Sequence, residues 1–294
     1  MRRFPFVTLD VFTDRRFGGN QLAVFPDARG LSDAEMQSLA SEFNLSETTF
    51  VLPPDDPANT ARVRIFNRTA EMPFAGHPNV GTAYVLADRA RDGILRFEQL
   101  AGLVEIAVER DAAGAVLSTT VAAPQPLTIG EALPLAPIAA CAGIPAEAIL
   151  TARHAPTLAS DGGNPRVLLE VTPQALATAA PDHAAFRRAV ETLPALGGRL
   201  SLYLYRRDGE RLRARMFSPL SGTPEDAATG SAATPLTGFL LSLSGAERHA
   251  IDILQGVEMG RPSLLRTTAR RMPDGIRATV GGGCVPVLSG EAQL

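Results

Sequence analysis

The chain has 294 residues, of which 45% are hydrophobic and 20% charged, with a formal net charge of −3 and a pI near 5.9. This length and composition predict a soluble globular protein of one long or two medium domains. The slightly acidic charge argues against nucleic acid and against a membrane surface as partners. The N-terminal segment lacks the apolar run of a signal peptide and no stretch approaches a membrane span, so we expect a cytoplasmic protein.

The basic residues are all arginine: the sequence contains 28 of them and no lysine. An enzyme that uses pyridoxal phosphate needs a lysine for its internal Schiff base, and a P-loop needs one for the phosphates. The Ser-x-x-Lys arrangement of some hydrolases fails for the same reason. These three classes of chemistry are therefore excluded.

The cysteines and histidines do not form a metal-binding pattern. Cys141 and Cys284 are far apart in the sequence, and we expect both to be buried as small apolar residues. The four histidines show no ligand spacing with one another or with the cysteines. The glycine loops also lack the Gly-x-Gly-x-x-Gly spacing of a dinucleotide site. We therefore expect neither a metal nor a cofactor.

The first 120 residues are predicted to alternate between strands and helices. The strands are expected at residues 4–13, 21–25, 48–52, 61–66, 95–97, 103–108 and 116–121. Ser32 and Glu35 form a capping box before an apolar helical pattern, which predicts a helix over residues 33–43. Another helix is expected after Pro78.

The proline-rich segment 122–137 is expected to cross between two domains. Beyond it we expect helices at 135–142, 145–150, 181–193 and after Gly230, strands at 166–171, 277–280 and 285–288, and a hairpin of 200–205 with 211–217. The predicted domains are an N-terminal one of residues 1–121 plus about 284–294, and a C-terminal one of residues 122–283.

One arrangement occurs twice: a strand, a glycine-bearing loop and the start of a helix. Arg62-Val-Arg-Ile-Phe66 precedes Glu71-Met-Pro-Phe-Ala-Gly-His77, and Arg213-Ala-Arg-Met-Phe217 precedes Pro224-Glu-Asp-Ala-Ala-Thr-Gly-Ser231. Two such loops facing each other would form a cleft with backbone N–H groups and a helix N-terminus on both walls, which suits a small anionic molecule. Two α+β halves of a pseudo-twofold molecule fit this repeat better than one doubly wound sheet.

Together with Asn44-Leu-Ser-Glu47 and Gln255-Gly-x-x-Met-Gly-Arg-Pro-Ser263, these loops resemble the PhzF family of phenazine-biosynthesis-like isomerases and epimerases, from about residue 5 to 288. The resemblance implies the diaminopimelate epimerase-like fold: two pseudo-symmetric α+β domains, each a barrel-like, mostly antiparallel sheet around a central helix. It also implies a homodimer and cofactor-free proton transfer within a small carboxylic acid, which is trans-2,3-dihydro-3-hydroxyanthranilate in the phenazine pathway.

The resemblance implies that Glu47 is the general acid/base. Moving a proton between carbons needs a group whose pKa lies well above the ~4.3 of free glutamic acid, and burial supplies this. Glu47 lies between a helix end and an apolar strand, although an exposed turn glutamate is the commoner fate of such a residue. His77 is expected to contact substrate or relay a proton, and Asp226 resembles the family aspartate that faces this histidine. A helix-capping role would explain Asp226 equally well.

The expected substrate-binding residues are Asn20, Gly76, Gly230 and Ser231. The amides of the last three, with the Ser231 hydroxyl, would bind a carboxylate. Asn20 and Asn164 each follow a glycine beside a strand and fit a turn or a ligand contact equally well.

The chain departs from the family pattern at three positions. Gln21 and Ala227 stand where the family usually has proline, and Pro235 falls within the second helix.

Two other functional classes remain open. One is an amino-acid epimerase or racemase that uses two thiols, as in diaminopimelate epimerase; it is disfavoured because neither cysteine lies in a loop motif. The other is a non-catalytic small-molecule-binding protein on the same fold, in which Glu47 is merely structural.

Overall fold

The computed structural model describes residues 1–162 and 165–294. Two compact units can be distinguished: residues 1–124 with 280–294, and residues 125–279. These boundaries lie a few residues from the sequence-based ones, and each unit is described by itself.

The first unit is a mostly antiparallel sheet with the strand order β18–β1–β2–β3–β4–β6–β7–β8. Its strands are β1 Arg3–Val11, β2 Asn20–Phe25, β3 Glu47–Leu52, β4 Ala61–Phe66, β5 Glu71–Met72, β6 Ile94–Gln99, β7 Gly102–Arg110, β8 Val116–Ala122 and β18 Cys284–Gln293. Only β2/β3 and β4/β6 are parallel among the pairs described here, so each needs a crossover connection. Helix α1 (Asp33–Phe43) makes the first crossover, and α2 (Gly76–Val85), followed by the 3₁₀ turn η1 (Ala87–Arg89), makes the second.

Helix α1 has the bounds that its capping box predicts. The Ser32 hydroxyl accepts from the Glu35 amide at 3.3 Å, and the Glu35 carboxylate accepts from the Ser32 amide at 2.8 Å. The helix buries Met36 and Leu39 against a cluster that includes Phe50. It therefore covers one face of the sheet.

Helix α2 is the central helix of the first unit, and residues 76–83 are all buried. A Cβ atom at Gly81 would lie 2.5 Å from a methyl group of Leu22 in β2, so the helix backbone lies directly against the sheet.

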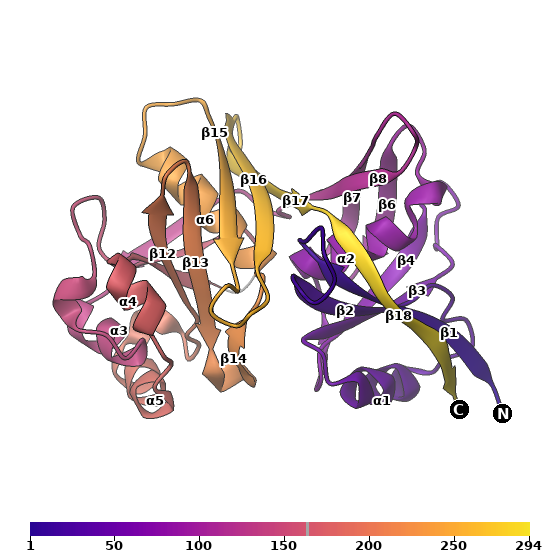
Figure 1. Ribbon diagram of the computed structural model, residues 1–294, viewed down its shortest axis with the longest axis horizontal. Coiled ribbons are helices and arrows are strands. Elements are labelled where there is room, and N and C mark those ends of the chain that lie inside the picture. The colour runs from indigo at the N-terminus through magenta and orange to yellow at the C-terminus, as the bar shows by residue number, and fades with distance from the viewer. Residues whose placement is uncertain (163–164) are drawn as a thin grey trace. The chain divides into compact units, whose positions relative to one another are not determined.

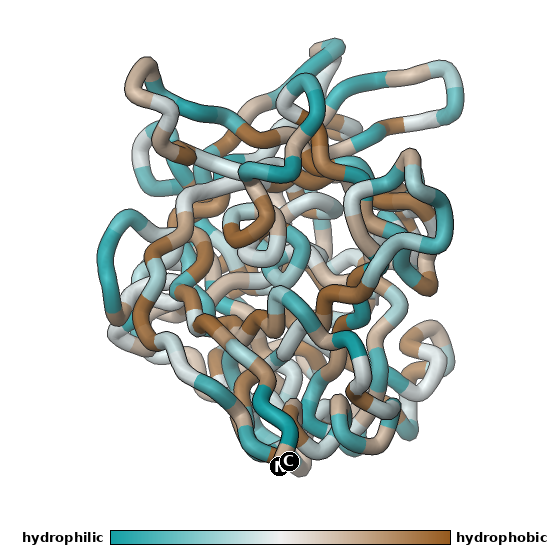
Figure 2. The backbone as a smooth tube through the Cα atoms, turned by 90° about the vertical axis from the view of Figure 1, so that its right-hand side faces the viewer, coloured by the Kyte–Doolittle hydropathy of each residue, from teal (hydrophilic) through white to brown (hydrophobic). Residues whose placement is uncertain are grey.

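Strands β1 and β18 bring the two ends of the chain together. They pair antiparallel from Arg3 with Gln293 to Val11 with Cys284, and Figure 2 shows the termini side by side. Residues 280–294 therefore complete the sheet that the first residues begin.

The second unit repeats this topology with the order β9–β10–β11–β12–β13–β15–β16. Its strands are β9 Thr128–Ala132, β10 Thr157–Ser160, β11 Arg166–Glu170, β12 Leu202–Asp208, β13 Arg211–Ser218, β14 Thr223–Asp226, β15 Arg248–Gln255 and β16 Ser263–Met272, and β17 Gly275–Gly282 crosses the boundary between the units. Its helices are α3 Leu135–Cys141, α4 Pro173–Thr178, α5 His183–Thr192 and α6 Gly230–Ser242, with 3₁₀ turns η2 Ala146–Ala148, η3 Pro194–Leu196 and η4 Pro219–Ser221.

The parallel pairs of this unit are β11/β12, connected through α4 and α5, and β13/β15, connected through α6. The order β13, β14, α6, β15, β16 thus matches the order β4, β5, α2, β6, β7 of the first unit. Figure 1 shows α2 and α6, each among the strands of its own unit. The predicted α+β fold, with a mostly antiparallel sheet around a central helix in each half, is confirmed.

One expectation for the second unit was wrong, and some of its strands were missed. Residues 145–150 do not form a helix, because the Leu150 amide donates to Glu170 beyond a single 3₁₀ turn and Ile149 bridges to Val171. Strands β15 and β16 were not expected, because much of the inward face of β16 consists of small or polar residues such as Ser263, Thr267 and Ala269.

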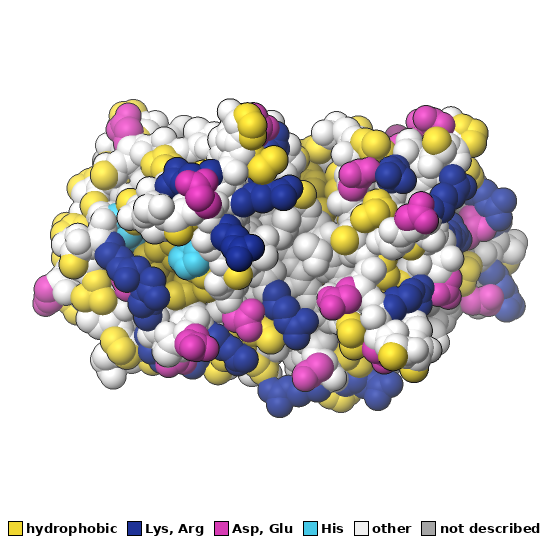
Figure 3. All heavy atoms as spheres, turned by 90° about the horizontal axis from the view of Figure 1, so that it is seen from above, with side chains coloured by type: hydrophobic (Ala, Val, Ile, Leu, Met, Phe, Trp, Pro, Cys, Tyr) yellow, Lys and Arg dark blue, Asp and Glu magenta, His cyan; other side chains and the backbone are white. Residues whose placement is uncertain are grey.

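Arginine and acidic side chains are interspersed over the face drawn in Figure 3. Exposed pairs such as Arg277 with Asp274, at 2.6 Å, contribute little to the stability of the fold, because solvent screens the two charges. Within the described ranges, no helix combines the length and the apolar character needed to cross a membrane.

Candidate functional site

Glu47 and His77 lie together in the first unit. Glu47 begins β3, directly after the turn at Asn44, which ends α1 in the left-handed conformation with φ 52°. His77 is the second residue of α2. The Glu47 Oε2 and His77 Nε2 atoms are 3.5 Å apart, and the side chains are 18% and 5% exposed. A mostly buried carboxyl beside an imidazole is suited to proton transfer.

Asn20 is held next to the Glu47 segment. It is the first residue of β2, 5% exposed, and its side-chain oxygen accepts from the Ser46 hydroxyl at 3.3 Å. Gly19 has φ +63°, and a Cβ there would lie 2.3 Å from the Val11 carbonyl oxygen, so only glycine fits. Because β2 and β3 are parallel, with Leu22 opposite Glu47, the two strands begin at the same edge of the sheet. Asn20 is therefore a buried strand residue at this edge.

His77 lies in the first turn of α2, where the backbone amides of the helix start are also found. The N-cap is Ala75, which provides no side-chain cap, so the Gly76 and His77 amides begin the helix without one. The Asn79 side chain, 0% exposed, donates to the Ala75 carbonyl at 3.0 Å and fixes this turn. A helix start of this kind favours an anion.

In the second unit, Asp226 ends β14, four residues before α6. Its Oδ2 accepts from the Thr229 hydroxyl at 2.6 Å, and Thr229 is the N-cap of α6. The N-cap position itself is thus occupied by Thr229 and not by Asp226. Gly230 and Ser231 are the first two residues of the helix, as expected.

The Ser231 hydroxyl accepts from Arg166 Nη2 at 3.1 Å. Arg166 is 8% exposed and also donates to the Ser201 hydroxyl at 3.2 Å. A guanidinium only donates, so the hydroxyl hydrogen of Ser231 is directed elsewhere and can be donated to an anion at the helix start. Arg166 was not predicted from the sequence as a site residue. A basic residue at the start of an apolar strand is the pattern that could have indicated it.

Pro235 does not interrupt α6. The helix runs from Gly230 to Ser242, and the Thr234 hydroxyl donates to the Gly230 carbonyl at 3.1 Å. The missing N–H at position 235 therefore affects only the first turn. Asn164, the other asparagine considered, lies outside the described residues.

At the start of each glycine loop, a glutamate is bound by an arginine of the preceding strand. Arg64 binds both oxygens of Glu71, at 2.7 and 2.6 Å, and lies 5.0 Å from the Phe66 ring centroid. Arg215 binds both oxygens of Glu225, at 2.7 and 2.8 Å, and lies over Phe217 at 4.9 Å. The repeated Arg-x-Arg-x-Phe pattern therefore holds the glutamate that leads into each loop, a pairing that the sequence did not reveal.

The two thiols are buried, as expected. Burial raises the pKa of Cys141 to about 11, and burial also raises the pKa of Cys284. A thiol with a raised pKa is a poor base and nucleophile near neutral pH, so these cysteines do not favour the two-thiol alternative. Across the described residues, no group of three or more His, Cys, Asp or Glu side chains could hold a metal ion.

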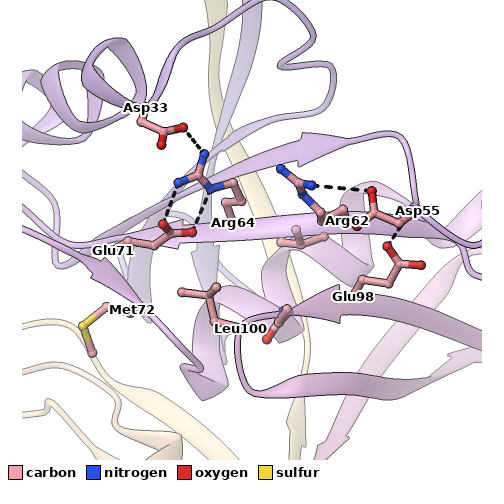
Figure 4. Close-up of a pocket in the computed structure, with 10 residues that line it drawn as sticks. Asp33, Asp55, Arg62, Arg64, Glu71, Met72, Glu98 and Leu100 are labelled. Atoms are coloured by element: carbon pink, nitrogen blue, oxygen red, sulfur yellow. Dashed lines mark hydrogen bonds and ion pairs between the residues drawn. The ribbon is translucent and has the colours of Figure 1, made fainter.

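A hollow of about 420 Å³ on the first unit contains none of the predicted site residues (Figure 4). It is lined by Asp33, Asp55, Arg62, Val63, Arg64, Glu71, Met72, Glu98, Gln99 and Leu100. Arg64 binds Glu71 and Asp33, and Arg62 lies 3.5 Å from Asp55. Because both arginines already face carboxylates, the hollow is poorly suited to an anionic substrate.

Comparison with known proteins gives a consistent result. The family model described as phenazine biosynthesis-like protein, PhzC-PhzF, matches residues 9–290. The chain is 37% identical over 298 residues to the trans-2,3-dihydro-3-hydroxyanthranilate isomerase of Pseudomonas aeruginosa, which covers 98% of this chain and 99% of that protein. It is 38% identical over 314 residues to an uncharacterized isomerase of Mesorhizobium japonicum, which covers 99% of each. A PhzF-family protein of Bacillus anthracis shares the fold, with a TM-score of 0.88 at 22% identity over 100% of both chains.

Proposed function

Because the chain belongs to the phenazine biosynthesis-like PhzC-PhzF family and is an isomerase, we propose that it moves a proton within a small carboxylic acid without a cofactor. The proposed reaction is of the trans-2,3-dihydro-3-hydroxyanthranilate isomerase type, the activity named for relatives at 36–37% identity. The observation that carries the proposal is the Glu47–His77 pair, 3.5 Å apart at the start of a central helix.

In the proposed reaction the Glu47 carboxylate takes a proton from one carbon of the substrate and the resulting carboxylic acid returns a proton to another carbon. The electron pair of the broken C–H bond shifts along the substrate double bond, so no electrons leave the substrate and no oxidant is needed. His77 contacts Glu47 Oε2 and can stabilise either protonation state of the pair. Asp226 is proposed as the second carboxyl group of the catalytic set, by resemblance to the family.

The substrate carboxylate is proposed to bind the amides of Gly230 and Ser231 and the Ser231 hydroxyl, with Gly76 as a further amide donor. Fixed amide dipoles need no reorganisation as charge develops on the substrate. Asn20 is proposed to contact the substrate beside Glu47. The cleft between the two halves stays a sequence-based prediction, as does the homodimer, which light scattering of the purified protein can test.

The decisive experiment replaces Glu47 by glutamine. Glu47→Gln keeps the shape of the side chain but cannot accept a proton from carbon, so turnover of trans-2,3-dihydro-3-hydroxyanthranilate should fall by about 10²–10⁴. Proton NMR in D₂O follows both the isomerisation and the incorporation of solvent deuterium. The affinity for 3-hydroxyanthranilate, a stable aromatic analogue, should change little.

Glu42→Gln is the matched control, because Glu42 is an exposed residue of α1. It should keep the wild-type rate. Substantial deuterium exchange in Glu47→Gln would assign the proton transfer to another residue, and a wild-type protein that binds the analogue without any exchange would favour a binding protein. Recovery of activity only on adding a metal, a nucleotide or pyridoxal phosphate after dialysis against chelator would contradict the cofactor-free reaction.

A further inference from the structure

Gln255, the last residue of β15, has no exposed surface and uses the full hydrogen-bonding capacity of its side-chain amide. Its Nε2 donates to the Asp226 carbonyl at 2.8 Å and to the Thr229 hydroxyl at 3.0 Å. Its Oε1 accepts from the Tyr203 hydroxyl at 3.0 Å and from the Thr229 amide at 3.2 Å. A primary amide offers two donors and two acceptor lone pairs, and all four are engaged here.

Three of these four bonds go to the last residue of β14 and to the loop between β14 and α6. The bond to the Thr229 hydroxyl also determines which way this hydroxyl donates. The Thr229 hydroxyl accepts from Gln255, so its single hydrogen is available for Asp226 Oδ2, which lies 2.6 Å away. The result is a one-way chain of donors from Gln255 through Thr229 to the Asp226 carboxylate.

The next residue, Gly256, allows the same loop to pack closely because it has no side chain. It has φ +74°, and a Cβ there would lie 2.5 Å from the Ala227 carbonyl oxygen and 3.1 Å from the Ala227 Cα atom. The loop therefore packs directly on the backbone of residue 256. Gln255 and Gly256 both determine the position of the loop: Gln255 through hydrogen bonds of its side-chain amide, and Gly256 because the absence of a side chain allows close backbone packing.

We propose that Gln255 is a positioning residue, which sets the orientation of the Asp226 carboxylate through the Thr229 hydroxyl. The inference rests on the proposed function in one respect, that Asp226 takes part in the reaction. Without Gln255, the Thr229 amide and the Asp226 carbonyl each lose this hydrogen bond, and no donor from residue 255 restricts the orientation of the Thr229 hydroxyl. A displaced catalytic group costs rate even when substrate binding is retained.

The first experiment measures the loop itself, independently of any activity. In the full-length protein, Gln255→Leu should speed hydrogen exchange of the amides at residues 227–229 by tenfold or more. The matched control is Thr267→Val, which also removes buried hydrogen bonds of the second unit, 2.6 Å to Thr237 and 2.7 Å to the Ile251 carbonyl. The control should leave exchange in the loop unchanged. Equal exchange in Gln255→Leu and wild type overturns the proposal.

The second experiment separates kcat from binding. Gln255→Leu should lower kcat for trans-2,3-dihydro-3-hydroxyanthranilate by about 10²-fold while Kd for 3-hydroxyanthranilate stays within about threefold. Thr267→Val should keep kcat within about twofold. Thr229→Val should act like Gln255→Leu, and the double variant should lose no more than either single one, since both act through one chain of bonds. Additive losses, or a wild-type kcat in Gln255→Leu, overturn the proposal.

If Gln255→Leu does not fold, Thr229→Ser and Thr229→Val decide between the outcomes, because only serine keeps the hydroxyl. Near-normal kcat in the serine variant and a large loss in the valine variant support the chain of donors, and equal kcat in both overturns it. A wild-type protein with no turnover of this compound would refute the proposed function. In that case hydrogen exchange in the loop still decides whether Gln255 holds it.

Discussion

At the residue scale, the Ser231 hydroxyl has its orientation restricted by Arg166. The guanidinium donates to Ser231 Oγ at 3.1 Å, so the hydroxyl hydrogen points away from Arg166 and can be donated to another acceptor. A carboxylate bound at the start of α6 would be such an acceptor. The buried positive charge behind the serine favours the same ligand.

Ser231→Ala should therefore weaken the binding of 3-hydroxyanthranilate by about tenfold or more, the size expected for a hydrogen bond to a charged group. Binding of 2-aminophenol, which lacks the carboxylate, should be unaffected. Titration calorimetry measures both. Ser242→Ala, at the other end of the same helix, is the control and should bind both compounds like wild type. An equal loss of affinity for the two ligands would show that Ser231 does not bind the carboxylate.

Asp161 gives a pH dependence to the stability of the second unit. It is 3% exposed, its Oδ2 has no hydrogen-bond partner among the described residues, and burial raises its pKa to about 7, against the opposing effects of Thr234 and Arg166. The unfolded chain releases this proton near pH ~4. Between these two values the folded state holds a proton that the unfolded state has lost, so the free energy of unfolding falls as the pH rises through this window.

Asp161→Asn should remove this contribution. The variant should gain on the order of a few kcal/mol relative to wild type at pH 8, and much less at pH 4, because the stabilising protonated form is already present there. Urea unfolding at a series of pH values measures the difference. Parallel stability curves for the two proteins would exclude Asp161 as the source.

At the element scale, the paired arginines fasten each glycine loop to its strand. Arg215 is 6% exposed, and besides Glu225 it binds the carbonyl oxygens of Leu176 and Ala179 at the end of α4. It thus ties one strand, one loop and one helix together, whereas Arg64 is more exposed and reaches Glu71 and Asp33.

Arg215→Met should lower the free energy of unfolding by about 2–4 kcal/mol, because it leaves the mostly buried Glu225 carboxylate, 17% exposed, without its cation. Arg215→Met combined with Glu225→Leu should recover part of this loss, since no uncompensated charge remains. Urea unfolding of the single and double variants tests the pair. A double variant that loses as much as the sum of the two single changes would show that the pair is not coupled.

The element scale also shows what could be predicted from the sequence. The bounds of α1 were predictable because a capping box is a local signal, and the repeated strand, loop and helix could be read because each half carries it in consecutive residues. The role of Gln255 was hidden because its partners lie at positions 203, 226 and 229. Glu47 and His77 were each named as site residues with the help of the family resemblance, but their contact was not predicted, because it depends on a strand and a helix brought together by packing.

At the scale of the whole molecule, the two units differ in how the chain builds them. The second unit is one continuous segment with its own core, which includes Phe186, Leu202 and Phe217. The first unit is made of two segments separated by the whole of the second.

The segment of residues 125–279 should therefore fold when expressed alone. We expect dispersed amide NMR signals and a cooperative urea transition, because the buried residues of its core come from within the segment. Residues 1–155, a fragment of equal length that contains no complete second unit, are the comparison and should give a weaker transition. A segment 125–279 without dispersed signals would mean that its sheet depends on the first unit.

The pairing of β1 with β18 has a consequence for synthesis in the cell. Domains usually fold in order as they leave the ribosome. Here β1 emerges first, yet the strand that covers its edge is made only after residue 283. An uncovered edge strand is a template for wrong pairing with other chains. Nascent chains of this protein should therefore depend on chaperones that hold the first unit until the last strand arrives.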